Sequence, residues 1–269
     1  MSTQAIETVP VRARDGVRIG ARCSGKTGRA LVFVHGVGST ASIWDAQLGA
    51  FADDFRCAAV ELRGNGVFEN PDPSLITRAT FAADVLDVCD ALGFERFTLV
   101  GCSLGGVVGF ELWQRASERM EAMAIVGSFA RYPAAQRYAS DVCAAVDKAG
   151  DMRRFALSRA SKLNLPPARL AETIEQMARK SVACYLASTR ATWTGDYRHV
   201  LRTIDVPLLV LCGERDAIAP FALSEEIASA VAGATLKVVN GAGHVANADA
   251  PTRFNELLRD FLSASVSIV

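Results

Sequence analysis

Eight short segments of apolar and β-branched residues recur along the chain, and they predict a β-sheet. The first two flank the pair Asp15-Gly16, which is typical of a hairpin turn between alternating strands. The later ones are short apolar runs, as expected of strands that are buried on both faces. The predicted strands cover residues 9–13, 15–23, 30–36, 56–62, 97–103, 121–128, 206–213 and 234–240.

Helical patterns alternate with the later strands. In these stretches apolar residues recur at the spacing of one helix face. The predicted helices cover residues 77–92, 104–116, 221–232 and 251–262. Because short apolar strands that alternate with helices form a largely parallel sheet, we expect an α/β fold: a mostly parallel eight-stranded sheet with helices on both faces.

Residues 129–199 break this alternation. The stretch is rich in Ala, Arg and Ser and contains no convincing strand. It offers helical segments at 134–149, 151–162, 167–180 and 181–192. We therefore expect residues 1–128 and 200–269 to form one core domain and residues 129–199 to form a helical cap inserted into it.

The composition and the charge of the chain limit which classes of partner it can bind. Half of the 269 residues are hydrophobic, enough for one domain with an insertion. Lys plus Arg and Asp plus Glu are both 29, so we expect no nucleic-acid partner. The N-terminal residues do not resemble a secretory signal, and no apolar run reaches the ~18 residues of a membrane span. A cytoplasmic protein with no membrane partner is the expectation.

Cysteines and histidines are scattered. The seven cysteines are odd in number and form no C-x-x-C pair, which argues against a disulfide framework and against a zinc site. The three histidines lie on separate predicted elements and have no ligand spacing. We expect neither a metal nor an organic cofactor.

Chemistry enters with the motif Gly101-Cys102-Ser103-Leu104-Gly105, a G-x-S-x-G between a predicted strand and helix. A sharp strand-to-helix turn exposes the serine, and the glycines relieve the clash that side chains would cause. The N–H of Leu104 and the positive end of the helix then point to where an oxyanion would form. We predict Ser103 as a nucleophile. The alternatives are a structural serine in a tight turn, and Cys102 as nucleophile, although its side chain should point away from the apex.

A serine nucleophile needs a base, and the candidates are His35, His199 and His244. His244 lies in a glycine-rich loop between the last predicted strand and the last helix, where an imidazole can reach over the sheet edge. We predict it as the general base. A structural histidine in a loop is the alternative.

The acid that orients the base is predicted to be Asp216. It follows the strand at 206–213, and ligands of α/β sheets bind at the carboxyl ends of strands. A carboxylate there can fix the tautomer of the imidazole and stabilise the imidazolium. Glu214 is the rival acid. Along the chain the three residues occur in the order Ser103, Asp216, His244, which is one of the orders in which triads of serine, acid and histidine occur.

Five motifs in order and spacing together resemble the α/β-hydrolase superfamily over essentially the whole chain. They are HGVGSTASIW (35–44), ELRGNG (61–66), GCSLGG (101–106), GERDAIAP (213–220) and GAGHVANADAP (241–251). The resemblance implies that the N–H groups of Val37 and Leu104 form the oxyanion hole and that His35 braces the loop.

The chain departs from the common family pattern in two places. Cys102 stands where His or Gln is frequent, and Glu61 opens a motif that usually begins with Asp. Neither departure removes a triad member. Serine at position 103 argues against haloalkane dehalogenases and epoxide hydrolases, which use Asp there.

The inserted segment chooses the substrate in capped members of the family. Candidate pocket residues are Phe129, Tyr132, Tyr185, Trp193 and Val245. Arg131 and Arg190 are candidate partners of a substrate carboxylate, and solvated arginines on a helix face are the alternative.

The motif His244-Val245-Ala246-Asn247 resembles the 3-oxoadipate enol-lactonase-like group. The leading hypothesis is a hydrolase of a small-molecule carboxylic ester or lactone, acting through an acyl-enzyme on Ser103. Two alternatives stay open: a carbon-carbon bond hydrolase of ring-fission dienones with the same triad, and a ligand receptor with slow hydrolysis. The sequence leaves a homo-oligomer open.

Overall fold

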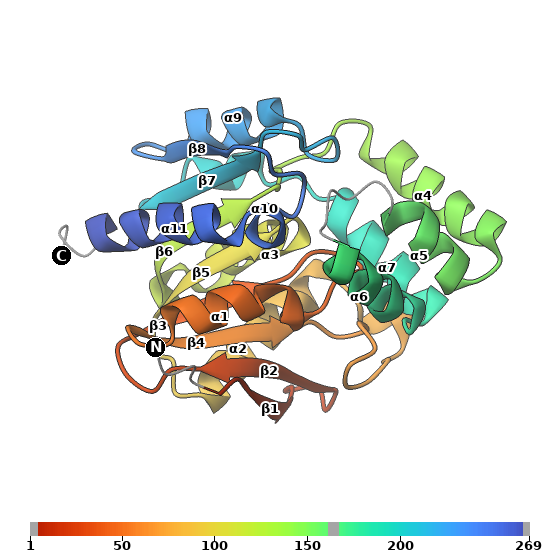
Figure 1. The fold of residues 1–269 in the computed structure, drawn as a ribbon, viewed down its shortest axis with the longest axis horizontal. Coiled ribbons are helices and arrows are strands. Elements are labelled where there is room, and N and C mark those ends of the chain that lie inside the picture. The colour runs from red at the N-terminus through yellow and green to blue at the C-terminus, as the bar shows by residue number, and fades with distance from the viewer. Residues whose placement is uncertain (1–4, 161–166, 266–269) are drawn as a thin grey trace.

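The computed structural model of the chain describes residues 5–160 and 167–265 (Figure 1). Its sheet has eight strands in the order β1-β2-β4-β3-β5-β6-β7-β8. The strands are β1 (Glu7–Arg12), β2 (Arg18–Ser24), β3 (Arg29–Val34), β4 (Phe55–Glu61), β5 (Phe97–Cys102), β6 (Met120–Val126), β7 (Leu208–Gly213) and β8 (Thr235–Val239). Each of the eight strands overlaps one of the eight predicted segments.

The sheet is antiparallel at one edge and parallel over the remaining strands. β1 and β2 pair antiparallel, and Gly16 adopts the positive φ of 89° that their tight turn requires. β2 also pairs antiparallel with β4, whereas the neighbours from β4 through β3 to β8 are parallel. The predicted mostly parallel sheet is confirmed.

Helices pack on both faces of the sheet, as predicted. One buried apolar cluster joins the sheet to α2, α3 and α9, and a second joins it to α1 and α11 (Figure 1). The helices of this part are α1 (Asp45–Phe51), α2 (Arg78–Ala91), α3 (Leu104–Ala116), α8 (Arg198–Leu201), α9 (Phe221–Ala230), α10 (Ala246–Asp249) and α11 (Pro251–Ser265). None of the described helices is long and apolar enough to cross a bilayer.

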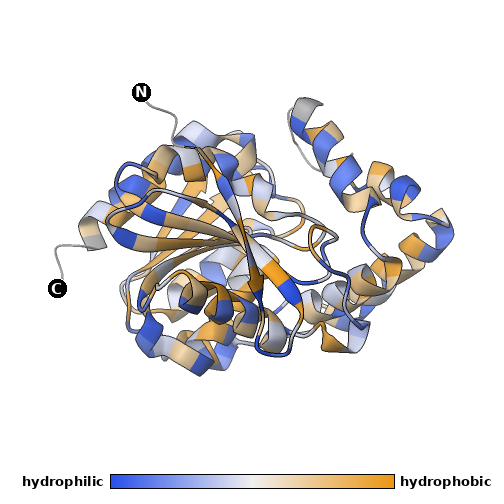
Figure 2. Cartoon of the chain, turned by 90° about the horizontal axis from the view of Figure 1, so that it is seen from below, coloured by the Kyte–Doolittle hydropathy of each residue, from blue (hydrophilic) through white to orange (hydrophobic). Residues whose placement is uncertain are grey.

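Four helices lie between β6 and α8, and we call them the helical insert. They are α4 (Ala135–Ala149), α5 (Met152–Ala160), α6 (Pro167–Ala178) and α7 (Val182–Trp193). Their positions follow the four predicted segments, although residues 161 and 162 lie outside the described part. Figure 1 shows the insert beside one end of the sheet, and Figure 2 shows its helices alternating between hydrophobic and hydrophilic positions. The bounds 1–128, 129–199 and 200–269 predicted for core and cap stay predictions.

A buried ion pair fixes the loop that follows β4. The guanidinium of Arg63 donates to both carboxylate oxygens of Asp84 at 2.8 and 2.5 Å, and to Asp15 at 2.6 Å. The side chains of Arg63 and Asp84 are 1% and 0% exposed. Burial raises the pKa of Asp84 to about 6, and the adjacent guanidinium opposes that rise. The carboxylate therefore depends on Arg63 to stay charged in the core.

Removing that arginine should destabilise the fold strongly. Arg63→Met leaves the Asp84 carboxylate buried without its partner, which is expected to lower the free energy of unfolding by about 3–5 kcal/mol. The exposed pair of Arg253 and Glu256 on α11 is the control, because Arg253→Met should change stability by less than about 1 kcal/mol. Urea denaturation measures both, and equal losses would contradict this account.

Candidate active site

Ser103 occupies a strained turn between β5 and α3. Its φ of 54° and ψ of −112° lie outside the regions that L-residues favour. The surrounding backbone holds it there: its N–H donates to the carbonyl of Val126 at 2.9 Å, and the hydroxyl of Ser128 donates to its carbonyl at 2.9 Å. The turn thus fixes the direction of the serine hydroxyl.

The glycines of the motif are required by close backbone approach. A Cβ on Gly101 would lie 2.4 Å from the carbonyl oxygen of Gly105, and a Cβ on Gly105 would lie 2.1 Å from that of Val34. Gly106 is equally tight, since its Cβ would lie 2.3 Å from the hydroxyl of Ser128. Only glycine lets α3 begin this close to β3 and β6.

His244 and Asp216 form a hydrogen-bonded pair. Nδ1 of the imidazole lies 3.0 and 2.9 Å from the two carboxylate oxygens. Asp216 Oδ1 also accepts the N–H groups of Ile218 at 2.9 Å and Ala219 at 2.8 Å. The side chain of Asp216 is fully buried, and that of His244 is 11% exposed. Because Nδ1 faces a carboxylate, it carries the proton in the neutral ring and Nε2 becomes the acceptor.

The rival acid points elsewhere. Glu214 is exposed, and its Oε2 accepts the N–H of Gly241 at 2.7 Å. A third carboxylate, Asp249, accepts the N–H of Gly243 at 2.6 Å, and burial raises its pKa to about 6. Of these three acids, Asp216 is the one that bonds the imidazole.

The other two histidines have structural surroundings. His35 is buried, with Nδ1 2.9 Å from the carbonyl oxygen of Gly36, and its Nε2 accepts the N–H of Leu62 at 3.2 Å. The bond to Leu62 connects the loop after β3 to the loop after β4. His199 is exposed and its Nε2 lies 2.7 Å from Gln114. Neither histidine lines the cavity at Ser103.

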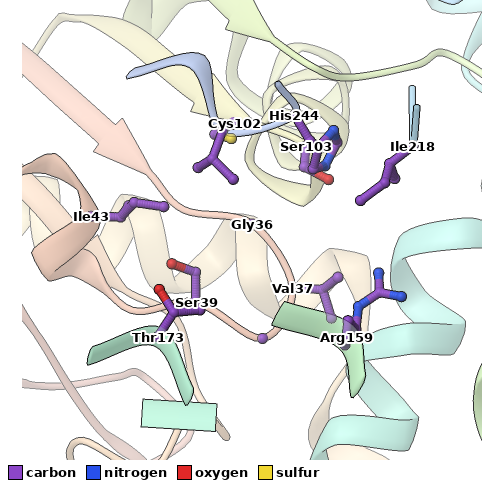
Figure 3. A pocket seen from close by; sticks show the side chains of 12 residues that line it. Gly36, Val37, Ser39, Ile43, Cys102, Ser103, Arg159, Thr173, Ile218 and His244 are labelled. Carbon is purple, nitrogen blue, oxygen red and sulfur yellow. The ribbon is translucent and has the colours of Figure 1, made fainter. Parts of the chain in front are cut away.

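Cys102 is buried against the same turn. Burial raises the pKa of its thiol, which disfavours the reactive thiolate. Figure 3 shows its sulfur apart from the side chains of Ser103 and His244. This environment opposes Cys102 as the nucleophile.

Two backbone N–H groups near Ser103 lack acceptors. Within the described residues, neither the N–H of Val37 nor that of Leu104 donates a hydrogen bond to the protein. Leu104 begins α3, where the first N–H groups have no partner inside the helix. A Cβ on Gly36 would lie only 3.2 Å from that of Ser103, so the Val37 loop runs directly beside the serine.

A cavity of about 50 Å³ opens at Ser103 (Figure 3). That volume holds a few waters or a small acyl group. Core residues and residues of the insert line it together: Gly36, Val37, Gly38, Ser39, Ile43, Cys102, Ser103, Arg159, Thr173, Ile218, His244 and Val245. Val245 lies in the wall, as the sequence suggested. No cluster of His, Cys, Asp and Glu that could hold a metal ion occurs among residues 5–160 and 167–265.

The four aromatic pocket candidates are not in this wall, which corrects the prediction. Phe129 and Trp193 are each 1% exposed and stack at 5.0 Å, and Tyr132 packs on both rings. Tyr185 is 1% exposed and packs on Phe155. Phe129, Trp193 and Tyr185 are therefore buried in the apolar interior, and Tyr132 is partly buried beside the first two.

Sequence reasoning missed several wall residues. Ile218 follows Asp216 by two positions, so its motif was a usable signal. Arg159 and Thr173 reach the cavity from α5 and α6. No motif marks these two, because the packing of the insert decides which helix face meets the cavity.

Gly127 leaves room for the His–Asp pair. Its φ is 57°, and a Cβ there would lie 2.8 Å from the carbonyl oxygen of His244 and 3.1 Å from Asp216 Oδ2. Gly150 has a φ of 77° and no atom within 4 Å of such a Cβ, so it is the matched control.

The pair of variants separates crowding from backbone strain. Gly150→Ala is expected to cost about 1–2 kcal/mol for its positive φ. Gly127→Ala should cost about 1–3 kcal/mol more, and it should weaken the downfield NMR signal of the proton between His244 and Asp216. Urea denaturation and proton NMR measure these effects. Equal costs and an unchanged signal would show that Gly127 does not protect the pair.

The chain is similar to known proteins over most of its length. Residues 31–257 match the family model described as the alpha/beta hydrolase family. A putative carbamate hydrolase RutD of Cronobacter turicensis is 26% identical, over 87% of this chain and 91% of its own. The 3-oxoadipate enol-lactonase 2 of Acinetobacter baylyi is 25% identical, over 84% of this chain and 85% of its own.

A solved structure has the same fold as this chain. The crystal structure of the enol-lactonase from Burkholderia xenovorans LB400 superposes with a TM-score of 0.87 and 26% identity, covering 94% of this chain and 99% of that one. The resemblance inferred from the five motifs is thereby confirmed. The chain belongs to the alpha/beta hydrolase family.

Proposed function

We propose that the protein is a serine hydrolase that cleaves a small carboxylic ester or lactone through an acyl-enzyme on Ser103. The observation that carries the proposal is that His244, which is hydrogen-bonded to Asp216, lines one cavity with a serine held at positive φ. Serine is a weak nucleophile that needs an adjacent base, and the imidazole supplies it. Relatives named as enol-lactonases support the choice of ester and lactone bonds.

Acylation begins when Ser103 Oγ attacks the carbonyl carbon and its proton passes to His244 Nε2. The negative charge of Asp216 stabilises the imidazolium that forms. The tetrahedral oxyanion is held by the N–H groups of Val37 and Leu104, which have no acceptor within the described residues. Collapse breaks the bond to the leaving alkoxide, which takes the proton back from His244.

Deacylation repeats these steps with water. His244 removes a proton from the water that attacks the acyl carbon, and then returns a proton to Ser103 Oγ, so that the acid leaves and the enzyme is restored.

We also propose that the helical insert is the cap of this site. Arg159 of α5 and Thr173 of α6 support that role, because both line the cavity opposite core residues.

Ser103→Ala removes the nucleophile. Hydrolysis should fall roughly 10⁴-fold or more, as removal of the nucleophile of such a triad does, while the unfolding midpoint stays near that of the wild type. A pH-stat assay on small esters and lactones measures the rate. The control is Cys102→Ala, which should keep most of the activity. Activity that survives in Ser103→Ala and disappears in Cys102→Ala would overturn the assignment.

The identity of the acid is tested by two isosteric variants. Asp216→Asn should lower kcat roughly 10³- to 10⁴-fold, because an amide favours the wrong tautomer of the imidazole. Glu214→Gln removes a charge two residues away that bonds the Gly241 N–H, and it should leave kcat near the wild-type value. Steady-state kinetics of the purified variants measure both. A larger loss in Glu214→Gln would reverse the assignment.

A further inference from the structure

The guanidinium of an arginine lies at the cavity beside Ser103. Arg159, near the end of α5, lines the wall, and among the described residues no Asp or Glu does. Figure 3 shows its side chain beside Val37, across the cavity from Ser103. Val37 and Ile218 lie along the wall between them and make this stretch apolar.

Arg159 has no carboxylate partner among the described residues. The neighbouring stretch 161–166, which lies outside the described part, contains neither Asp nor Glu in its sequence. The groups that face the guanidinium are instead the phenols of Tyr185, Tyr138 and Tyr132. A partly buried guanidinium without a counter-charge has lost part of its hydration and has gained no anion.

Other arginines of the insert differ in this respect. Arg153 pairs with Glu175 at 2.6 Å, and Arg169 pairs with Glu172 at 2.7 Å. Arg131, considered from sequence as a carboxylate partner, lies 3.9 Å from Asp196 and is half exposed. Arg190, the second such candidate, is exposed and lies outside the wall of the cavity. Of these three arginines, Arg159 is the one that lines the cavity at Ser103, whereas Arg131 and Arg190 do not.

We propose that Arg159 binds a free carboxylate of the substrate, so that the ester or lactone cleaved at Ser103 carries a second carboxyl group at its far end. The inference rests on the proposed function of Ser103. A planar guanidinium matches a carboxylate with two parallel hydrogen bonds. The apolar wall of Val37 and Ile218 suits a short hydrocarbon spacer between the scissile carbonyl and this carboxylate.

The test compares two esters of equal length, monomethyl glutarate and the neutral methyl valerate. Wild-type protein should hydrolyse the half-ester with the lower KM. Arg159→Gln should raise the KM for monomethyl glutarate roughly 10- to 100-fold, as expected when a hydrogen bond to a charged group is lost. Its KM for methyl valerate should change much less than its KM for monomethyl glutarate, because the neutral ester has no carboxylate to lose this contact. A pH-stat assay measures all four rates.

Two further variants control for charge and folding. Arg159→Lys keeps the charge and loses the fork, so its KM for the half-ester should be intermediate. Arg190→Gln removes an exposed arginine of the same insert and should leave the KM and kcat for both esters unchanged. Thermal unfolding of each variant shows whether it is folded. Equal losses for both esters in a folded Arg159→Gln would overturn the inference.

Binding without turnover separates this inference from the proposed function. Calorimetry with Ser103→Ala should detect monomethyl glutarate, and the double variant with Arg159→Gln should not bind it. If wild type hydrolyses methyl valerate in a Ser103-dependent way but shows no preference for the half-ester, the carboxylate site is wrong and the hydrolase stands. If neither ester is hydrolysed but the calorimetric difference appears, the proposed ester hydrolysis fails and the carboxylate site stands.

Discussion

The backbone at Ser103 is the constraint on which the site depends. A φ of 54° is costly for a residue with a Cβ, and it persists because β5 and α3 are joined without a connecting loop. That junction is sterically feasible because Gly105 lies against the carbonyl of Val34 and Gly101 against Gly105. The same closeness brings the start of α3 beside the Val37 loop. One tight turn therefore places Ser103 beside the Val37 loop, and both line one cavity.

The sheet supplies the second half of the site. Asp216 follows β7 and His244 follows β8, and the two strands are parallel neighbours. Their carboxyl ends meet at one edge, where loops carry ligand-binding side chains. Gly127 follows β6 at the same edge and leaves space for the pair. The insert brings a positive charge, Arg159, to the wall of the cavity, where no acidic side chain occurs within residues 5–160 and 167–265.

Sequence reasoning reached the sheet and the three residues of the proposed triad because both are encoded locally. Strand patterns have a short period, and Ser103, Asp216 and His244 each follow a predicted strand within a recognisable motif. The substrate wall was not accessible in this way. Phe129 and Trp193 were chosen as aromatic residues of the insert, yet they stack on each other in the interior. Arg159 went unnoticed because its direction depends on how α5 packs, which no local pattern records.

The most direct test of the account is to trap the covalent intermediate. The protein is mixed with an activated ester such as p-nitrophenyl acetate, quenched in acid within the first turnover, and digested for peptide mass spectrometry. An acyl group on the peptide at Ser103, accumulating at the rate of the p-nitrophenol burst, is the predicted result. An acyl group on Cys102, or steady product release with no acylated peptide at any time, would contradict the central claim.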